Sequence, residues 1–212
     1  MSLKLPAIYP FSAVVGQDNF KLALQLTAIN PAIGGVLVSG PRGSAKSTLA
    51  RAMAELMPNA APFVTLPLGA SLEMVTGSID LEAAMQSQSV AFNPGLLAKG
   101  HNGILYVDEV NLLQDSLVDV LLDVSASGIN TIERDGLSHS HPAKCLLLGT
   151  MNPDEGELRP QLQDRFGLSV ELSNSYSIAE RVEIVQRREA FDIDSTSFIK
   201  SYSAEQSRLQ AQ

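Results

Sequence analysis

The 212-residue sequence contains no tryptophan, a single cysteine and fewer basic than acidic residues. Because Cys145 has no second cysteine to pair with and opens an apolar run, we predict a buried, reduced, structural thiol. The net charge of −8 argues against duplex DNA or RNA as the main partner, since phosphate neutralisation requires clustered Lys and Arg. No apolar run approaches the ~18 residues of a membrane span, and no signal-peptide pattern opens the chain. These absences predict a cytoplasmic protein with no membrane span.

What the sequence does contain is a series of short apolar, β-branched runs separated by helical stretches. The 45% of hydrophobic residues can bury a normal core, and the length suits one large α/β domain, or one domain plus a fragment. Strands that alternate with helices imply a mostly parallel sheet with helices on both faces. The predicted strands are 35–39, 63–66, 104–107, 146–150 and 168–172, and the clearest helices are 19–29 and 47–57.

Two segments do not fit a minimal α/β unit and are predicted to be β-hairpin insertions. Residues 77–93 include an alternating polar and apolar stretch, and residues 129–139 alternate around Asp135-Gly136, a dipeptide typical of hairpin turns. Ordinary surface loops are the alternative interpretation of both segments. His139 and His141 lack Cys or acidic partners at metal-ligand spacing, so we predict a solvated edge there rather than a zinc site.

A glycine-rich segment, Gly40-Pro41-Arg42-Gly43-Ser44-Ala45-Lys46-Ser47, nearly matches the phosphate-binding pattern Gly, four residues, Gly, Lys, Ser or Thr. It lies between a predicted strand and a predicted helix, so backbone N–H groups and the helix dipole would hold phosphate oxygens. We predict that Lys46 contacts the β- and γ-phosphates, that Ser47 is a direct Mg²⁺ ligand, and that Thr48 either adds a hydroxyl near the α-phosphate or only caps the helix. Ala45 replaces the second glycine of the pattern, and its Cβ costs little if its φ is helical. A plain strand-to-helix loop is the alternative.

Two adjacent carboxylates, Asp108 and Glu109, follow the apolar run 104–107. In phosphate-loop proteins this end of the sheet lies beside the bound triphosphate. Asp108 is predicted to hold Mg²⁺, mainly through water, and Glu109 to orient and deprotonate the attacking water. A solvated turn is the alternative for an isolated Asp-Glu pair, but the position downstream of the phosphate loop favours the site.

Asn152 and Arg165 complete the candidate catalytic residues. Asn152 follows the predicted strand 146–150, and its amide can hydrogen-bond the γ-phosphate or the attacking water, although Asn-Pro is also an ordinary turn opener. Of two arginines within 158–167, we favour Arg165 as a group that reaches into a neighbouring subunit's site and neutralises transition-state charge. A salt bridge from Arg165 to Asp164 or another carboxylate is the alternative.

In this order, the motifs resemble those of the AAA+ family of ring-forming ATPases over about residues 7–190, and within it the magnesium-chelatase ATPase subunit I group. The resemblance implies that Val15 and Gly16 belong to the adenine-side segment and that both hairpins are insertions typical of the group. It implies ATP and Mg²⁺ as cofactors, residues 1–190 as the nucleotide-binding domain, and residues 191–212 as a connecting helix at the start of a truncated helical lid. The segments that carry the resemblance are 40–43, 66–70, 95–98, 106–113 and 158–162.

The resemblance further implies an ATP-hydrolysing motor that forms a homo-oligomeric ring, expected to be a hexamer. Its implied partners are an integrin-like chelatase subunit and a large porphyrin-binding subunit, and ATP turnover would drive Mg²⁺ insertion into the porphyrin. A MoxR-type AAA+ ATPase that remodels other proteins and a cobalt-chelatase motor are the related alternatives. From another class, Ala45 and the missing lid motivate a nucleotide-gated scaffold without useful hydrolysis.

Overall fold

A computed structural model describes residues 7–57, 61–80, 91–173 and 175–211. Five parallel strands form one sheet in the order β2-β5-β8-β1-β9, which confirms the predicted five-stranded parallel sheet. Each strand lies within one residue of its predicted bounds, because the apolar runs that predicted the strands are the segments that the sheet buries. The strands are β1 (Val36–Ser39), β2 (Phe63–Leu66), β5 (Ile104–Val107), β8 (Leu146–Met151) and β9 (Leu168–Glu171).

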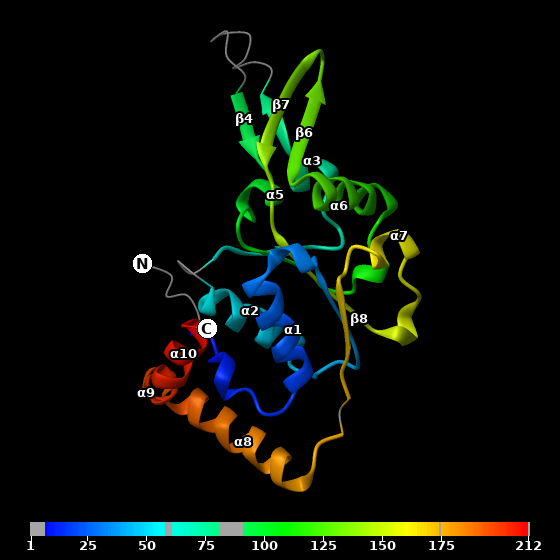
Figure 1. The fold of residues 1–212 in the computed structure, drawn as a ribbon. Coiled ribbons are helices and arrows are strands. Elements are labelled where there is room, and N and C mark those ends of the chain that lie inside the picture. The colour runs from blue at the N-terminus through cyan, green and yellow to red at the C-terminus, as the bar shows by residue number, and fades with distance from the viewer. Residues whose placement is uncertain (1–6, 58–60, 81–90, 174, 212) are drawn as a thin grey trace.

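Helices cover both faces of the sheet, as the alternation of strands and helices predicted (Figure 1). Successive residues of β1 point to opposite faces, so Val36 and Val38 pack against one core cluster and Leu37 against the other. The first cluster includes apolar residues of α1 (Asp18–Ile29) and α2 (Lys46–Leu56). The second includes residues of α5 (Leu96–Lys99), α6 (Asp115–Ser127) and α7 (Pro160–Gln163). Short 3-10 turns are η1 (Phe11–Ala13), η2 (Pro31–Ile33), η3 (Val110–Leu112) and η4 (Pro153–Glu155).

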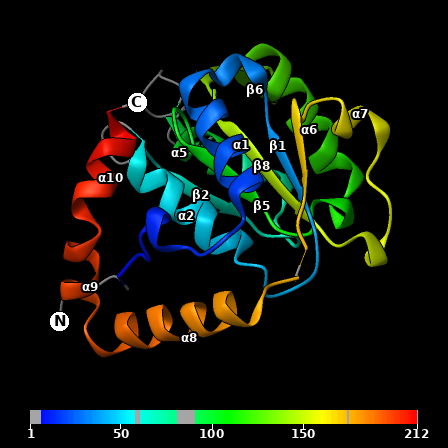
Figure 2. The same cartoon turned by 60° about the horizontal axis from the view of Figure 1, so that its bottom comes forward.

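Three consecutive helices end the chain and run along the outside of the molecule, as Figure 2 shows. They are α8 (Ile178–Ile193), α9 (Ser195–Ser201) and α10 (Ser203–Gln210). Phe191 and Phe198 pack against Ala13, and Gln210 Nε2 donates to Glu55 O on α2 at 3.2 Å. The predicted boundary at 190/191 therefore lies inside α8, and the segment expected to be one connecting helix is divided among three. No helix within the described residues is long and apolar enough to cross a lipid bilayer.

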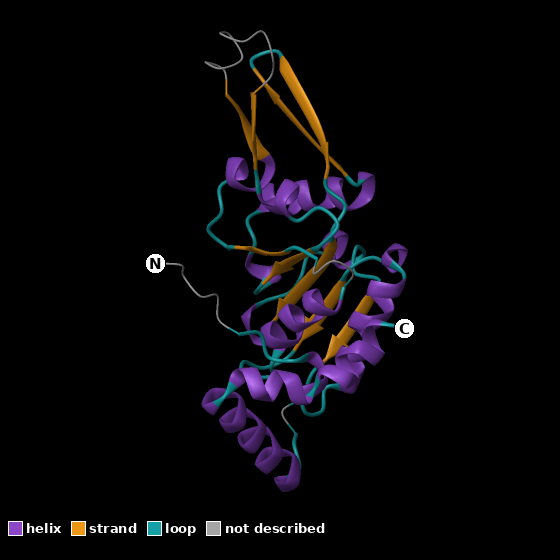
Figure 3. Ribbon diagram, turned by 90° about the vertical axis from the view of Figure 1, so that its left-hand side faces the viewer, coloured by secondary structure: helices purple, strands orange, loops and turns teal. Residues whose placement is uncertain are grey.

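Both predicted insertions contain antiparallel hairpin strands, and Figures 1 and 3 show them extending together from one end of the molecule. The first hairpin follows α3 (Leu72–Thr76) and pairs β3 (Gly77–Asp80) with β4 (Ala91–Pro94). Residues 81–90 of this predicted hairpin lie outside the described residues. The second pairs β6 (Ile129–Arg134) with β7 (Leu137–Pro142), so it continues beyond its predicted end at residue 139.

Aromatic packing joins the two hairpins. The Phe92 ring stacks on His139 at 4.3 Å and on His141 at 5.1 Å between centroids, so both histidines contact an aromatic ring where a solvated edge was expected. The buried Asn130 donates from Nδ2 to Thr76 O at 2.9 Å. In the part of the chain that the structure describes, no group of His, Cys, Asp and Glu is suited to hold a metal ion.

Candidate functional site

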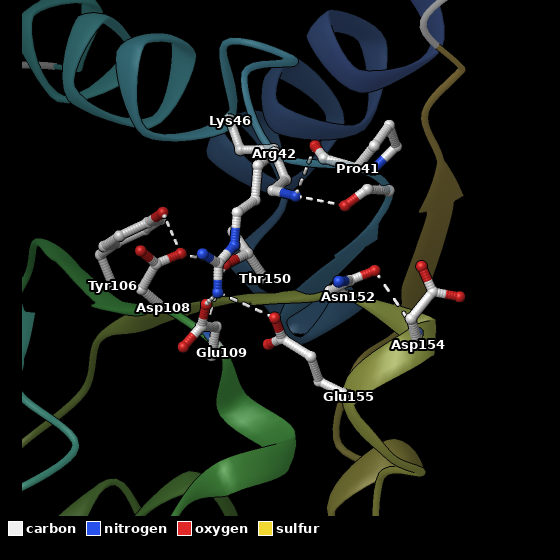
Figure 4. Close-up of polar contacts among 11 residues, drawn as sticks. Pro41, Arg42, Lys46, Tyr106, Asp108, Glu109, Thr150, Asn152, Asp154 and Glu155 are labelled. Atoms are coloured by element: carbon white, nitrogen blue, oxygen red, sulfur yellow. Dashed lines mark hydrogen bonds and ion pairs between the residues drawn. The ribbon is translucent and has the colours of Figure 1, made fainter.

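The phosphate loop and the predicted acidic and amide residues leave the sheet at one edge, as Figure 4 shows. The strands β1, β5 and β8 are neighbours and parallel, so their carboxyl ends lie side by side. The register pairs Ser39 with Met151 and Val107 with Gly149. Each of these strands continues into a segment that carries predicted site residues: 40–45 after β1, 108–109 after β5 and 152 after β8.

The loop itself requires glycine where it leaves β1. Gly40 has φ +155°, and a Cβ there would lie 2.8 Å from Leu172 O, which only glycine avoids. The Lys46 side chain folds back over the loop, and its Nζ donates to Gly40 O at 2.5 Å and to Pro41 O at 3.1 Å. Burial lowers the pKa of Lys46 from its ordinary value, while Asp108 and Glu109 oppose this shift. The predicted phosphate-contacting ammonium is therefore positioned above the loop.

Ala45 has the backbone conformation that explains why the motif normally has glycine at this point. Its φ is 62° and its ψ is 21°, so it lies in the left-handed region immediately before α2. Ala45 does not have the helical φ at which its Cβ would cost little free energy. A residue with a Cβ costs roughly 1–2 kcal/mol in this conformation. The loop thus has the glycine-loop geometry with strain at one position.

The hydroxyl groups at the start of α2 stand in different environments. Ser47 is exposed and Thr48 is half-buried. Ser44 is buried, and its Oγ donates to Pro41 O at 2.9 Å, which braces the loop from inside. A Cβ at Gly43 would meet nothing within 4 Å, so the concave side of the loop is open there. Ser47 is thus free to supply an oxygen ligand, as predicted for the Mg²⁺ site, and this role stays a prediction.

Asp108 is oriented by two hydroxyl groups that the sequence analysis did not identify. Tyr106 OH donates to Asp108 Oδ1 at 3.0 Å, and Thr150 Oγ1 donates to the same oxygen at 2.5 Å. Burial raises the pKa of the Tyr106 phenol, so this group remains a hydrogen-bond donor. No hydrogen bond from the described residues reaches Asp108 Oδ2. Asp108 is an exposed residue, so this second oxygen is the one that would be available to a hydrated Mg²⁺.

Glu109 occupies a strained position beside Asp108. Its φ of 53° is left-handed, and its N–H donates to Thr150 Oγ1 at 3.3 Å. The carboxylate Oε1 accepts from Arg42 Nη2 at 3.1 Å, and the same nitrogen donates to Glu155 Oε1 at 2.8 Å. Arg42 thus projects across the site toward two carboxylates, and Glu155 was missed because it lies on a different loop.

Asn152 lies at the same edge and begins the turn η4. Its Oδ1 accepts from Asp154 N at 3.4 Å, which leaves its amide Nδ2 without a hydrogen bond to any described residue. This is the group that the predicted contact with a γ-phosphate or water would use. The fold therefore brings Lys46, Asp108, Glu109 and Asn152 together, and their roles stay predictions.

Arg165 lies at the opposite edge of the sheet. Its carbonyl accepts from Gly35 N at 3.1 Å, just before β1 begins, whereas the phosphate loop starts at Gly40. Five residues of extended strand separate these points by about 16 Å, too far for the side chain to reach the site of its own chain. The guanidinium forms no ion pair with the residues that the structure describes, and the alternative salt bridge to Asp164 is not observed. Arg165 therefore lies outside the site of its own chain, and its role at a neighbouring subunit's site stays a prediction.

The predicted adenine-side segment packs under an aromatic ring. Gly16 has φ +67°, and a Cβ there would lie 3.3 Å from Tyr176 Cε1. Gln17 Nε2 donates to Tyr176 OH at 2.5 Å. No hydrogen bond in the described ranges joins Val15 or Gly16 to the phosphate loop, so their role stays a prediction. Tyr176 was missed because it lies far along the chain, just before α8.

Known proteins share both the sequence and the fold. Residues 35–166 match the AAA domain (dynein-related subfamily). The chain is 47% identical to the magnesium-chelatase 38 kDa subunit of Cereibacter sphaeroides, over 95% of this chain and 70% of that protein. The chain belongs to the AAA family and, within it, to the group of the magnesium-chelatase 38 kDa subunits. Membership implies nucleotide use with Mg²⁺ involvement, and the oxygen donors of Asp108 and Ser47 fit that ion.

Further relatives of this AAA domain differ in length. The chloroplastic magnesium-chelatase subunit ChlI of Oryza sativa subsp. indica is 46% identical over 98% of this chain and 59% of that protein. An uncharacterized protein of Mycobacterium tuberculosis is 53% identical over 92% of this chain, yet the match covers only 32% of its length. A structure of the complex between subunits BchI and BchD of magnesium chelatase gives a TM-score of 0.75 at 45% identity, covering 97% of this chain and 74% of that chain. The chain thus spans about a third to three quarters of these proteins.

Proposed function

We propose that this AAA domain is the ATP-hydrolysing motor of a metal chelatase, which couples ATP turnover to Mg²⁺ insertion into a porphyrin held by partner subunits. The observation that carries the proposal is the convergence of Lys46, Asp108, Glu109 and Asn152 on one sheet edge. The similarity to magnesium-chelatase subunits supports the coupling to metal insertion. ATP and Mg²⁺ are the proposed cofactors.

Each group has a distinct role in the proposed reaction. The loop 40–47 binds phosphate oxygens through backbone N–H groups, and Lys46 neutralises charge on the transferred group. Asp108, mainly through water, and Ser47, directly, would hold Mg²⁺, which would supply positive charge beside the phosphates. Glu109 orients a water and accepts its proton, while Asn152 hydrogen-bonds the γ-phosphate or that water. Thr48 contributes a hydroxyl on the α-phosphate side, and Val15 and Gly16 line the adenine.

The proposal includes a ring of identical subunits, expected to be hexameric. The separation of Arg165 from the site of its own chain supports this assembly, because the arginine serves a site only across a subunit contact. The proposed partners are an integrin-like subunit and a large porphyrin-binding subunit. Residues 1–190 are the proposed nucleotide-binding domain, and residues 191–212 begin the proposed lid.

The hydrolysis step is tested on the purified chain with ATP and Mg²⁺. We expect Glu109→Gln to lower kcat by about 10²-fold or more while nucleotide affinity is kept, because only the proton acceptor is lost. Lys46→Ala is expected to abolish nucleotide binding. Glu157→Gln is the matched control, since Glu157 is exposed on the loop after η4 and its side chain forms no hydrogen bond or ion pair with the described residues. Unchanged kcat in Glu109→Gln would contradict the assignment of the base.

The chelatase step is tested by adding candidate partner subunits and asking which metal–porphyrin pair consumes ATP. Stimulation with Mg²⁺ and a porphyrin supports the proposal, whereas stimulation with Co²⁺ alone indicates the cobalt-chelatase alternative. Turnover that responds to a protein client, and to no porphyrin, indicates a MoxR-type remodelling ATPase.

One observation favours a second candidate function, a nucleotide-gated scaffold that assembles without useful hydrolysis. The left-handed Ala45 adds strain to the loop that must hold the transferred phosphate. If the parent chain and Glu109→Gln both bind ATP and neither turns it over, the scaffold replaces the motor.

A further inference from the structure

An aromatic stack links the phosphate-loop helix to the acid that follows β5. The guanidinium carbon of Arg51, on α2, lies 4.8 Å from the centroid of the Phe63 ring, and Phe63 stacks on Tyr106 at 5.6 Å between centroids. Tyr106 OH in turn donates to Asp108 Oδ1 at 3.0 Å, as Figure 4 shows. Contacts from one side chain to the next therefore run from the helix to Asp108.

The sheet places the two stacked rings on one face. The register sets Thr65 of β2 beside Tyr106 of β5, and Phe63 is two residues before Thr65, so both rings point to the same face. Both pack with the core cluster to which α2 contributes apolar residues. Because β2 is the outermost strand, Phe63 has a neighbouring strand on one side only and is half-buried. Within the described residues, Arg51 and Tyr106 supply all of its aromatic and cation–π contacts.

Arg51 connects this stack to the helix of the phosphate loop. Its side chain is exposed, and its guanidinium forms no hydrogen bond or ion pair in the part of the chain that the structure describes. A cation over the face of an aromatic ring is attracted by it, so the Arg51 guanidinium restrains the orientation of the Phe63 ring. Arg51 belongs to the same helix as Lys46 and Ser47. The stack thus joins α2, which carries one predicted Mg²⁺ ligand, to β5, which precedes the other.

The orientation of the Tyr106 ring decides how Asp108 is presented. The hydroxyl groups of Tyr106 and Thr150 both donate to Asp108 Oδ1, and no described residue donates to Oδ2. Groups that orient a metal ligand contribute to metal affinity without touching the metal. We propose that Arg51 and Phe63 are positioning residues that hold the Tyr106 ring, and through its hydroxyl group keep Asp108 Oδ2 available to the Mg²⁺ that accompanies the nucleotide. This inference rests on the proposed ATPase function and deepens it.

Binding of a fluorescent, non-hydrolysable ATP analogue to the full chain tests the inference, with Kd measured in Mg²⁺ and again in EDTA. Phe63→Leu removes the ring and is expected to raise Kd in Mg²⁺ about three- to fivefold, within the range of one aromatic pair. Kd in EDTA is expected to stay unchanged, because only the presentation of Asp108 to the ion is altered. Phe63→Tyr keeps the ring and is expected to match the parent. Arg51→Met, at an exposed position outside the core, is expected to raise Kd in Mg²⁺ about twofold.

A double-mutant cycle shows whether the effect passes through the Tyr106 hydroxyl group. Tyr106→Phe keeps the ring but removes the donor to Asp108 Oδ1. In this background Phe63→Leu is expected to cause no further rise of Kd in Mg²⁺, because the ring no longer acts on the carboxylate. A loss of packing alone would instead raise Kd by the same factor in both backgrounds.

Arg188→Met is the matched control for Arg51→Met. The Arg188 guanidinium carbon also lies over a phenylalanine ring, 5.6 Å from the centroid of Phe191 on α8, and this substitution is expected to leave both Kd values unchanged. An unchanged Kd in Mg²⁺ for Phe63→Leu, an equal rise in Mg²⁺ and in EDTA, or a full effect in the Tyr106→Phe background overturns the inference. If the parent hydrolyses ATP and Glu109→Gln does not, the proposed function stands in each of these cases. A parent that hydrolyses no ATP and binds the analogue equally well in Mg²⁺ and in EDTA overturns both.

Discussion

The central sheet has one edge at the carboxyl ends of its strands (the carboxyl edge) and one at their amino ends (the amino edge). These two edges carry different residues. At the carboxyl edge, loops after three neighbouring strands bring together charged and polar groups of the candidate site. The amino edge holds Arg165 and an apolar groove of about 640 Å³ that includes Cys145. In a parallel sheet all strands end on the same side, so polar loop residues gather at one edge. The comparison teaches that a single chain carries the phosphate loop and Arg165 at opposite edges, where they cannot meet, and in the proposed ring these would be the two halves of one intersubunit site.

The largest effect is expected when Arg165, the candidate residue at the amino edge, is removed. Arg165→Ala should lower kcat by about 10³-fold, since an arginine that neutralises phosphoryl-transfer charge is worth at least that factor. Mixing Arg165→Ala with Lys46→Ala should recover activity, because each inactive chain supplies the half that the other lacks. Hydrolysis by the mixture is compared with hydrolysis by each variant alone. Mixing that restores nothing would show that the two edges do not complete one site.

A smaller effect is expected from the hydroxyl that orients Asp108. Thr150→Val keeps the shape but removes the donor to Asp108 Oδ1, and groups that support metal ligands typically contribute tenfold or more. We expect about a tenfold rise in the Mg²⁺ concentration that gives half-maximal hydrolysis. Thr131→Val, on an exposed hairpin strand, is the matched control. An unchanged Mg²⁺ dependence would remove Thr150 from the carboxyl-edge site.

A measurement of the free energy of unfolding tests whether Ala45, at the carboxyl edge, is strained. Ala45→Gly should raise the free energy of unfolding by about 1 kcal/mol, or about 2–4 °C in Tm, because glycine adopts the left-handed conformation without a Cβ clash. Ala126→Gly in the regular backbone of α6 should lower it by about 0.5 kcal/mol. Thermal melts of both variants give the comparison, and a destabilised Ala45→Gly would contradict the strain at this position.

The smallest effect concerns the thiol at the amino edge. Burial raises the pKa of Cys145 to about 11, so at pH 8 nearly all of the thiol is protonated and unreactive. Alkylation by iodoacetamide should be slow at pH 8 and should rise about tenfold per pH unit toward pH 10, since only the thiolate reacts. The urea-unfolded chain should react at the rate of an ordinary cysteine. Cys145 is half-buried, where the sequence analysis predicted a buried thiol, and rapid labelling of the folded chain at pH 8 would contradict the raised pKa of this thiol.

Prediction succeeded where a local pattern decides the structure. Apolar runs gave the strands to within one residue, and Asp135-Gly136 correctly marked the turn between β6 and β7. It missed Tyr106, which bonds Asp108 two residues further on, and it missed Thr150, Glu155 and Tyr176, which contact residues from distant segments. It also left the backbone angle of Ala45 open. Thr150 could have been suspected from its place near the end of a buried strand, two residues before Asn152.

The sequence by itself determined the order of the motifs and which residues are candidates for the chemistry. A strand, a glycine-rich loop and a helix starting at Lys46 are local features. Two acids that follow a buried strand of a parallel sheet must lie at its carboxyl edge. Only the tertiary structure decided that Ala45 is left-handed, that Arg42 is shared by Glu109 and Glu155, and that Arg165 lies at the other edge of the sheet from the phosphate loop. Those outcomes depend on how distant segments pack, because side-chain pairing across loops is set by strand order and register, which no single segment encodes.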